Sequence, residues 1–118
     1  GQLAERLAQE RSCVVVITGK VDIVSDGSRI FFIKNGDAMM GNIVGTGCMA
    51  ASVIGTFAAV EKDFVLAAAA GLACFEIAAE LAVKKAKGPG TFKEQLFDCI
   101  YALNKNTVER MQKVYLVE

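Results

Sequence analysis

The spacing of apolar residues changes several times along the first part of the chain, and each change predicts a separate element. Gln2–Glu10 carries leucine and alanine on one side and charged residues elsewhere, which is typical of an amphipathic helix. The β-branched run Val14–Ile17 predicts a strand covered on both faces. Two further apolar runs, Val21–Val24 and Arg29–Ile33, flank an Asp26-Gly27 pair, which is typical of a β-hairpin.

Helical patterns dominate the middle of the chain. A helix is predicted at about Cys48–Val60, directly after a glycine-rich stretch. An alanine-rich helix is predicted at about Phe64–Ala86, with Asp63 in position to cap its first turn. Gly88 and Pro89 follow, and this pair is typical of the end of a helix.

The last part of the chain predicts one more helix and one ambiguous element. Thr91-Phe92-Lys93-Glu94 has the pattern of a capping box, which predicts a helix that runs to about Asn104. Thr107–Val114 is expected to form a short helix or a strand. The sequence therefore predicts an α/β layered fold, in which a short sheet of three or four strands with a hairpin is followed by three helices.

Composition and charge exclude several classes of function. The chain has 118 residues, of which 53% are apolar, and its 13 acidic and 13 basic side chains give no formal net charge. This balance gives no electrostatic reason to expect nucleic acid or an anionic membrane surface as a partner. The segment Phe64–Val83 is long enough to cross a bilayer, but it contains Glu76 and Glu80. We expect a buried core helix, with Glu76, Glu80 and Lys84 as a solvated stripe.

The ionisable residues narrow the possible chemistry. The sequence has no histidine, which removes the commonest general base and the commonest metal ligand. Its four cysteines form no C-x-x-C pair, so we expect no metal site. Three of them lie in apolar segments and no signal peptide is visible, so we expect buried free thiols in a reducing cytoplasm over disulfides. Asp22 and Asp26 are interpreted as hairpin residues, not as metal ligands. Acid–base chemistry then depends on carboxylates, lysines or cysteines.

Gly45-Thr46-Gly47-Cys48 stands where a helix is expected to begin. The first amides of a helix are unpaired and carry a partial positive charge, and glycines let an anion approach them closely. A cysteine there can act as a base or a nucleophile, because the same field stabilises a thiolate. No lysine follows Gly47, so the motif is not a P-loop. The stretch alone leaves two interpretations open, an anion site or a simple tight turn before a helix.

The motifs VVVITGKVDIVSDG, NG, IVGTGCMAASVIGTFAAVEKD and KGPGTF, in this order, resemble the C-terminal half of the hydroxyethylthiazole kinase family of the ribokinase-like superfamily. The resemblance covers about residues 3–104. Gly-Thr-Gly-Cys followed by methionine is specific, because most ribokinase-like relatives place an aspartate at the position of Cys48. The resemblance implies that residues 1–118 are the C-terminal part of one ribokinase-like α/β/α kinase domain, without its N-terminal half.

The same resemblance implies an activity and a set of site residues. The activity is ATP-dependent phosphorylation of the hydroxyethyl group of 4-methyl-5-(2-hydroxyethyl)thiazole, in thiamine biosynthesis and salvage. Gly45, Thr46 and Gly47 would form the anion hole for the transferring phosphoryl group. Cys48 would lie next to the substrate hydroxyl as the catalytic residue, either accepting its proton or positioning it. Thr18 and Gly19 would contact ATP, and the Mg²⁺ ligands are expected upstream of Gly1.

The sequence departs from the family pattern beside this motif. Asp37-Ala38 stands where the family often has His-Pro, Ile43-Val44 replaces the common Val-Thr, and Lys20 replaces an acidic residue. These changes keep the amides and the thiol, so they bear on substrate preference more than on reaction type. Because the thiazole pocket of the family lies upstream of Gly1, we expect the isolated chain to have little or no activity.

The partners and the rival functions follow from the same resemblance. The family assembles as a trimer, so we expect a homo-oligomer or a pairing with the missing N-terminal half, with no nucleic acid or membrane partner. One rival function is another small-alcohol kinase of the superfamily, which Cys48 disfavours. A second rival is a non-catalytic α/β module for binding or assembly, which the intact Gly-Thr-Gly-Cys motif disfavours.

Overall fold

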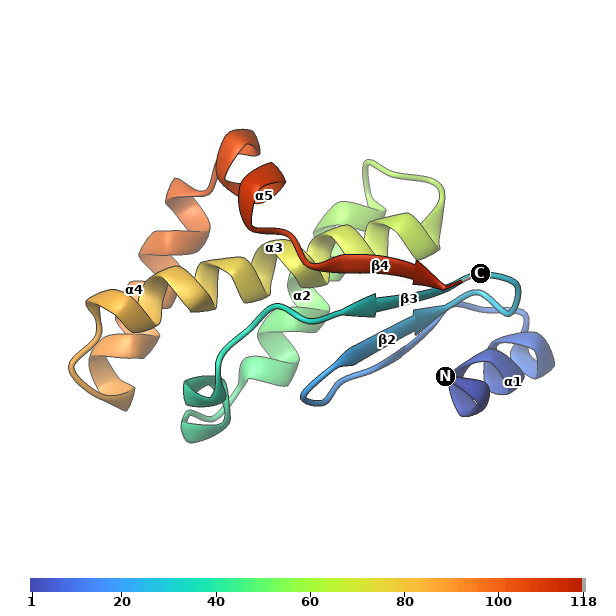
Figure 1. The fold of residues 1–118 in the computed structure, drawn as a ribbon, viewed down its shortest axis with the longest axis horizontal. Helices are drawn as coiled ribbons and strands as arrows, with labels where there is room; N and C mark the ends of the chain where they lie inside the picture. Colours follow the sequence, from blue (N-terminus) through green and yellow to red (C-terminus); the bar gives the residue numbers. More distant parts are fainter. Residues whose placement is uncertain (118) are drawn as a thin grey trace.

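A computed structural model describes residues 1–117, and over this range the chain forms a four-stranded antiparallel sheet with helices on both of its faces (Figure 1). The strand order is β1-β2-β3-β4, so each strand pairs with its neighbour in the sequence of strands. The elements in chain order are α1 (Gln2–Arg11), β1 (Val15–Ile17), β2 (Asp22–Ser25), β3 (Ile30–Ile33), the 3₁₀ helix η1 (Ala38–Asn42), α2 (Thr46–Ala58), α3 (Phe64–Lys85), α4 (Pro89–Ala102), α5 (Lys105–Met111) and β4 (Val114–Val117).

The predicted hairpin is present as β2 and β3. The two strands pair with Val24 opposite Phe31, and the connecting loop holds Gly27 at a φ of 96°. Asp26 stabilises this loop because its carboxylate accepts hydrogen bonds from the amides of Ser28 and Arg29, at 3.0 and 2.8 Å. The Asp-Gly signal therefore identified both the turn and the residue that holds it.

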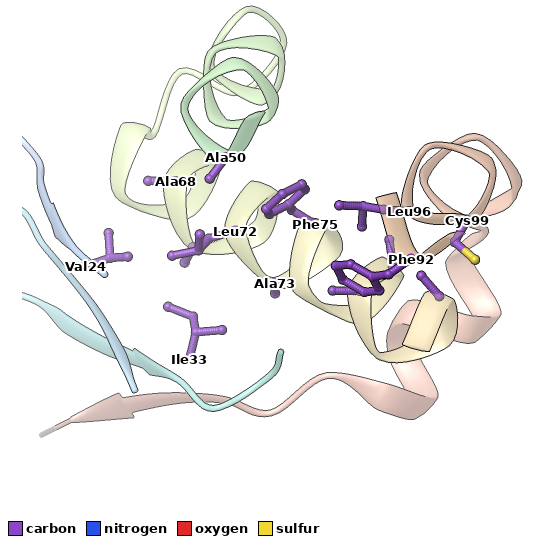
Figure 2. Close-up of a cluster of buried hydrophobic side chains, with 14 of the residues drawn as sticks. Val24, Ile33, Ala50, Ala68, Leu72, Ala73, Phe75, Phe92, Leu96 and Cys99 are labelled. Carbon is purple, nitrogen blue, oxygen red and sulfur yellow. The ribbon is translucent and has the colours of Figure 1, made fainter. Parts of the chain in front are cut away.

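The two faces of the sheet are covered by different helices. Val24 and Ile33 point to the side of α3 and belong to the main core (Figure 2). The opposite face is covered by α1, whose Ala4 and Ala8 are fully buried. The first strand, β1, contacts α1, and its Val16 packs against the main core, as expected for a strand with cover on both faces, but its residues are only half-buried.

Helix α3 is the centre of the structure. It packs against α2, α4 and two strands of the sheet, and its Leu72 and Phe75 are almost completely buried. Figure 2 shows Phe92 and Leu96 of α4 next to Phe75. The helix is long and apolar enough to cross a membrane, but 67% of its most apolar window is buried inside the fold. The expected core helix is confirmed.

Two predicted helix caps differ from the structure. Asp63 directly precedes α3, but both of its carboxylate oxygens accept hydrogen bonds from Arg29 at 2.9 Å, and its side chain makes no cap bond. Helix α4 starts at Pro89, two residues before the predicted capping box. Thr91 therefore lies inside the first turn, where its hydroxyl accepts hydrogen bonds from the amides of Lys87 and Gly88. In both cases the polar side chain forms hydrogen bonds with partners other than those that the predicted cap requires.

Of the two alternatives for Thr107–Val114, the helix is confirmed, because Lys105–Met111 forms α5. Strand β4 begins only at Val114, runs to Val117 and pairs antiparallel with β3. Within residues 1–117, four α-helices therefore follow the hairpin instead of the predicted three. The layered α/β fold class is confirmed.

Helices α2 and α3 approach closely at Gly71. A side chain at this position would place its Cβ 3.2 Å from the Cα of Ile54 on α2 and 3.4 Å from the Phe57 ring. We therefore predict that Gly71→Ala lowers the free energy of unfolding by about 1–2 kcal/mol, because the overpacking cost exceeds the gain in helix propensity. The urea midpoint of the 118-residue chain measures the effect.

Gly55 provides the matched control, since it also lies inside a helix but has open space around its Cβ position. Gly55→Ala should raise the free energy of unfolding by about 0.5–1 kcal/mol through helix propensity alone. An equal rise for Gly71→Ala would show that the two helices can separate at no cost, and would contradict the prediction.

Candidate active site

A cavity of about 600 Å³ opens beside the start of α2, where the turn after β1 meets the loop that follows β3. Helix α3 closes its inner side with Phe75 and Glu76. The turn, the loop and the helix start that surround the cavity contribute most of the other lining residues, among them Thr18, Gly19, Lys20, Asp22, Asn35, Gly36, Asp37, Thr46 and Gly47.

The start of α2 has the geometry of an anion site. Gly45 precedes the helix with a φ of 100°, a left-handed conformation that favours glycine, and its carbonyl accepts the first helical hydrogen bond from Met49 at 2.9 Å. Within residues 1–117 the helix start has no side-chain cap, so its first amides are available to a ligand. Thr46 and Gly47 line the cavity directly.

Thr18 and Gly19 line the same cavity as this helix start. They follow β1 and are exposed. The amide of Gly19 donates a hydrogen bond of 2.9 Å to Oδ1 of Asp22, which holds the turn against the first residue of β2. The structure thus brings four of the six predicted site residues, Thr18, Gly19, Thr46 and Gly47, around one cavity.

The other two predicted residues lie beside this cavity. Gly45 and Cys48 flank Thr46 and Gly47 in sequence but fall outside the set of described residues that line the cavity. Cys48 is the third residue of α2 and is exposed, and its carbonyl accepts a hydrogen bond of 3.0 Å from the hydroxyl of Ser52. The four cysteines are free, as expected, but Cys13 and Cys48 are exposed and only Cys99 is buried.

The inner side of the cavity holds a pair of buried carboxyl groups. Asp22 and Glu76 are only 3% and 5% exposed, and the two carboxyl groups are hydrogen-bonded to each other. Burial, together with this hydrogen bond and the nearby charges of Asp22 and Glu80, raises the pKa of Glu76 to about 10. Glu76 therefore keeps its proton at neutral pH.

A second carboxylate on α3 holds the loop on the other side of the cavity. Glu80 accepts a hydrogen bond of 2.7 Å from the Nδ2 group of Asn35, and Lys113 lies 3.8 Å from its other oxygen. Asn35 is itself buried, and its side chain also bonds the carbonyl of Met111 and the amide of Lys113. This network links the loop after β3 to the connection between α5 and β4.

The expectation of a solvated Glu76, Glu80 and Lys84 stripe is wrong for the two glutamates. The spacing of one turn is the same in a solvated stripe and in a buried polar row, so spacing alone does not distinguish them. The sequence did contain evidence against a solvated stripe: residues 64–83 are otherwise almost entirely apolar, so α3 has no polar face. An acidic residue in such a helix either is buried with a partner or faces a cavity.

The fold and the cavity together define the class: a layered α/β domain in which an uncapped, glycine-rich helix start opens onto a cavity at one end of the sheet. The model of the Hydroxyethylthiazole kinase family matches residues 2–106. The chain belongs to the hydroxyethylthiazole kinase family.

Individual relatives agree with this assignment. The chain is 50% identical to a hydroxyethylthiazole kinase of Methanosarcina acetivorans over 111 residues, which are 94% of this chain and 42% of the relative. It is 44% identical to the Pyrococcus furiosus hydroxyethylthiazole kinase, covering 99% of this chain and 44% of that protein. The solved hydroxyethylthiazole kinase structure from Pyrococcus horikoshii OT3 matches with a TM-score of 0.95 and 42% identity, over 99% of this chain and 46% of that one. The chain thus spans less than half the length of these relatives.

The buried acid makes stability depend on pH. An unfolded chain releases the Glu76 proton near the ordinary pKa of 4.5, whereas the folded chain keeps it to about pH 10. The folded state therefore binds more protons between these values, so its stability should fall as the pH rises through this window. We predict that Glu76→Gln removes this part of the decline, which thermal unfolding from about pH 4.5 to about pH 9 measures.

Glu94→Gln is the matched control, because Glu94 is exposed on α4. The Glu76→Gln variant should be more stable than the wild-type chain at about pH 9 and similar to it at about pH 4.5, while the control follows the wild type. Parallel curves for Glu76→Gln and the wild-type chain would contradict a protonated Glu76.

Proposed function

We propose that the protein carrying this chain transfers the γ-phosphoryl group of ATP to the hydroxyethyl group of 4-methyl-5-(2-hydroxyethyl)thiazole, in thiamine biosynthesis and salvage. The chain is proposed to be the C-terminal part of the kinase domain, and its role is to supply the anion hole. The single observation that carries this is the uncapped start of α2, which opens onto one cavity with Thr18 and Gly19. Membership of the family supports the choice of substrate over other small alcohols.

The proposed reaction uses the residues as follows. The hydroxyl oxygen of the substrate attacks the γ-phosphorus, the bond from that phosphorus to the bridging oxygen breaks, and ADP leaves. The amides of Gly45, Thr46 and Gly47 stabilise the negative charge on the transferring group, which is the main contribution expected in phosphoryl transfer. Thr18 and Gly19 bind ATP in the same cavity.

Cys48 has two possible tasks in this scheme. As a base it takes the proton of the substrate hydroxyl; as a positioning group it only orients that hydroxyl. Its place in the first turn of α2, directly after Gly45, Thr46 and Gly47, is compatible with both tasks. Cys48 is exposed and lies beside the cavity, so its thiol is accessible to a substrate that is bound next to the cavity.

Mg²⁺ is the usual companion of ATP in phosphoryl transfer, where it neutralises charge on the phosphates. The described residues do not fit a site for it: residues 1–117 contain no group of three or more acidic, cysteine or histidine side chains that could hold a metal ion. Glu76 is also a poor metal ligand, because burial raises its pKa to about 10 and it stays protonated at neutral pH. We place the Mg²⁺ ligands in the part of the kinase outside this chain.

We further propose a cytoplasmic homo-oligomer, a trimer by family resemblance, or an association with the rest of the kinase domain. Several large apolar side chains support association because they are exposed: Val44 is 92% exposed, Tyr101 93% and Phe97 51%. Neutral net charge gives no support to a nucleic acid or membrane partner.

The test replaces the matching 42% of the Methanosarcina acetivorans kinase with this chain. Formation of phosphorylated thiazole alcohol and release of ADP are then measured together. We expect activity from the graft and little or none from the 118-residue chain alone. A graft that folds and binds ATP but never phosphorylates the thiazole alcohol would sink the proposed function. Full activity of the chain alone would show that it is not a fragment of the catalytic unit.

Substitutions at Cys48 then separate its two possible tasks. Cys48→Ala should lower kcat at least about tenfold, and by about 10²–10⁴ if the thiol is a general base. Cys48→Ser keeps a hydrogen-bonding group without a base, whereas Cys48→Asp supplies the base that most ribokinase-like relatives have. Activity in the aspartate variant but not in the serine variant would identify a base. Cys13→Ala is the matched control, since Cys13 is also an exposed free thiol.

A further inference from the structure

Glu76 is a buried acid that the proposed reaction does not use. It is 5% exposed, lies on an otherwise apolar stretch of α3, and lines the cavity directly. A buried carboxyl group costs folding free energy unless it is partnered, and a neutral side chain of similar size would fill the space more favourably. A functional role at the cavity would explain why a carboxyl group occupies this buried position.

Glu76 is connected to both segments that border the cavity, the turn after β1 and the loop after β3. Its carboxyl group is hydrogen-bonded to Asp22, and Oδ1 of Asp22 accepts the Gly19 amide at 2.9 Å. Oε1 of Glu76 also lies beneath Gly36, so close that a Cβ on Gly36 would stand 3.1 Å from it. One turn further on, Glu80 accepts from the Gly36 amide at 3.4 Å. One helix thus holds the turn after β1 and the loop after β3 at a defined separation.

We propose that Glu76 is a positioning residue for the nucleotide: its carboxyl group holds Asp22, and Asp22 in turn holds the Thr18–Gly19 turn at the wall of the cavity. This inference rests on the proposed function, in which Thr18 and Gly19 bind ATP. Ordering a loop on binding costs free energy, so a turn held in place before ATP arrives improves affinity for ATP specifically. The alcohol substrate gains nothing from this turn.

The charges around the pair agree with an anionic ligand. Asp22 from β2 and Glu80 from α3 face Glu76, while Lys20, Lys34 and Asp37 stand around the rest of the cavity. Lys113 lies 3.8 Å from Glu80 and offsets part of its charge. Because Glu76 keeps its proton, it adds no negative charge to the inner side of the cavity. An ionised Glu76 there would repel the phosphates of ATP.

The test uses a variant that keeps the volume of Glu76 but loses its hydrogen bond. In the graft, Glu76→Met should raise KM for ATP about tenfold and change KM for the thiazole alcohol less than about twofold. Glu76→Gln can still donate to Asp22 and should stay within about twofold of the wild type for both. Ile77→Met controls for methionine at a fully buried neighbour outside the cavity lining.

A second substitution tests whether Glu76 acts through Asp22. Asp22→Ala should raise KM for ATP as Glu76→Met does, and the double variant should show no further rise, because both remove one chain of contacts. In the 118-residue chain, water exchange of the Gly19 amide proton, followed by NMR, should accelerate about tenfold in Glu76→Met and remain unchanged in Glu76→Gln.

The outcomes separate this inference from the proposed function. A folded Glu76→Met graft with an unchanged KM for ATP overturns the inference, as do equal changes for both substrates with normal Gly19 exchange. If the wild-type graft never phosphorylates the alcohol, the proposed function fails, and the dissociation constant for a fluorescent ATP analogue replaces KM. The positioning role then stands if Glu76→Met weakens that binding about tenfold, and falls if it does not.

Discussion

The structure depends on the close packing of α3 against α2 on one side and the sheet on the other. Small residues make it possible: the helix buries a long series of alanines, and Gly71 lets its backbone meet that of α2 at Ile54. The large side chains Leu72 and Phe75 of this helix are buried in the core that α3 forms with the sheet and α4. Close-packed interiors tolerate little change in volume, so this helix fixes the relative positions of α2, α4 and the sheet.

The geometry of the cavity depends on the same helix. Glu76 and Glu80 project from α3 one turn apart, and they reach the loops that follow β1 and β3 through Asp22 and Asn35. The positions of these loops therefore depend on the helix to which Asp22 and Asn35 connect them. A displacement of α3 would therefore change the packing of the core and the geometry of the site together.

Local signals predicted most of the fold, and long-range contacts account for what they missed. The Asp26-Gly27 turn and the alanine-rich helix are encoded by neighbouring residues, and both were correct. Strand β4 pairs with β3, a strand far earlier in the chain, and no local pattern contains that pairing. The glycine-rich start of α2 could be predicted from Gly45 to Cys48, whereas the Asp22–Glu76 pair could not, because it exists only once α3 lies beneath β2. Asp63 failed as a cap for the same reason, since Arg29 comes from a distant hairpin.

The two ends of the sheet differ in how completely their polar groups are satisfied. At the hairpin end, Arg29 joins Asp26 and Asp63 in a network of short hydrogen bonds. At the cavity end stand a left-handed Gly45, a helix start without a side-chain cap among the described residues, and a carboxyl pair that keeps a proton. A left-handed glycine, Gly27, and a helix start without a side-chain cap bond, that of α3, also occur at the hairpin end, so among the described residues the buried carboxyl pair is what sets the cavity end apart. A buried acid that keeps its proton is not what folding alone would select, because it leaves stability unused. Asp22 and Glu76 line the same cavity as Thr46 and Gly47 at the start of α2, which is the pattern expected when ligand binding completes what folding leaves open.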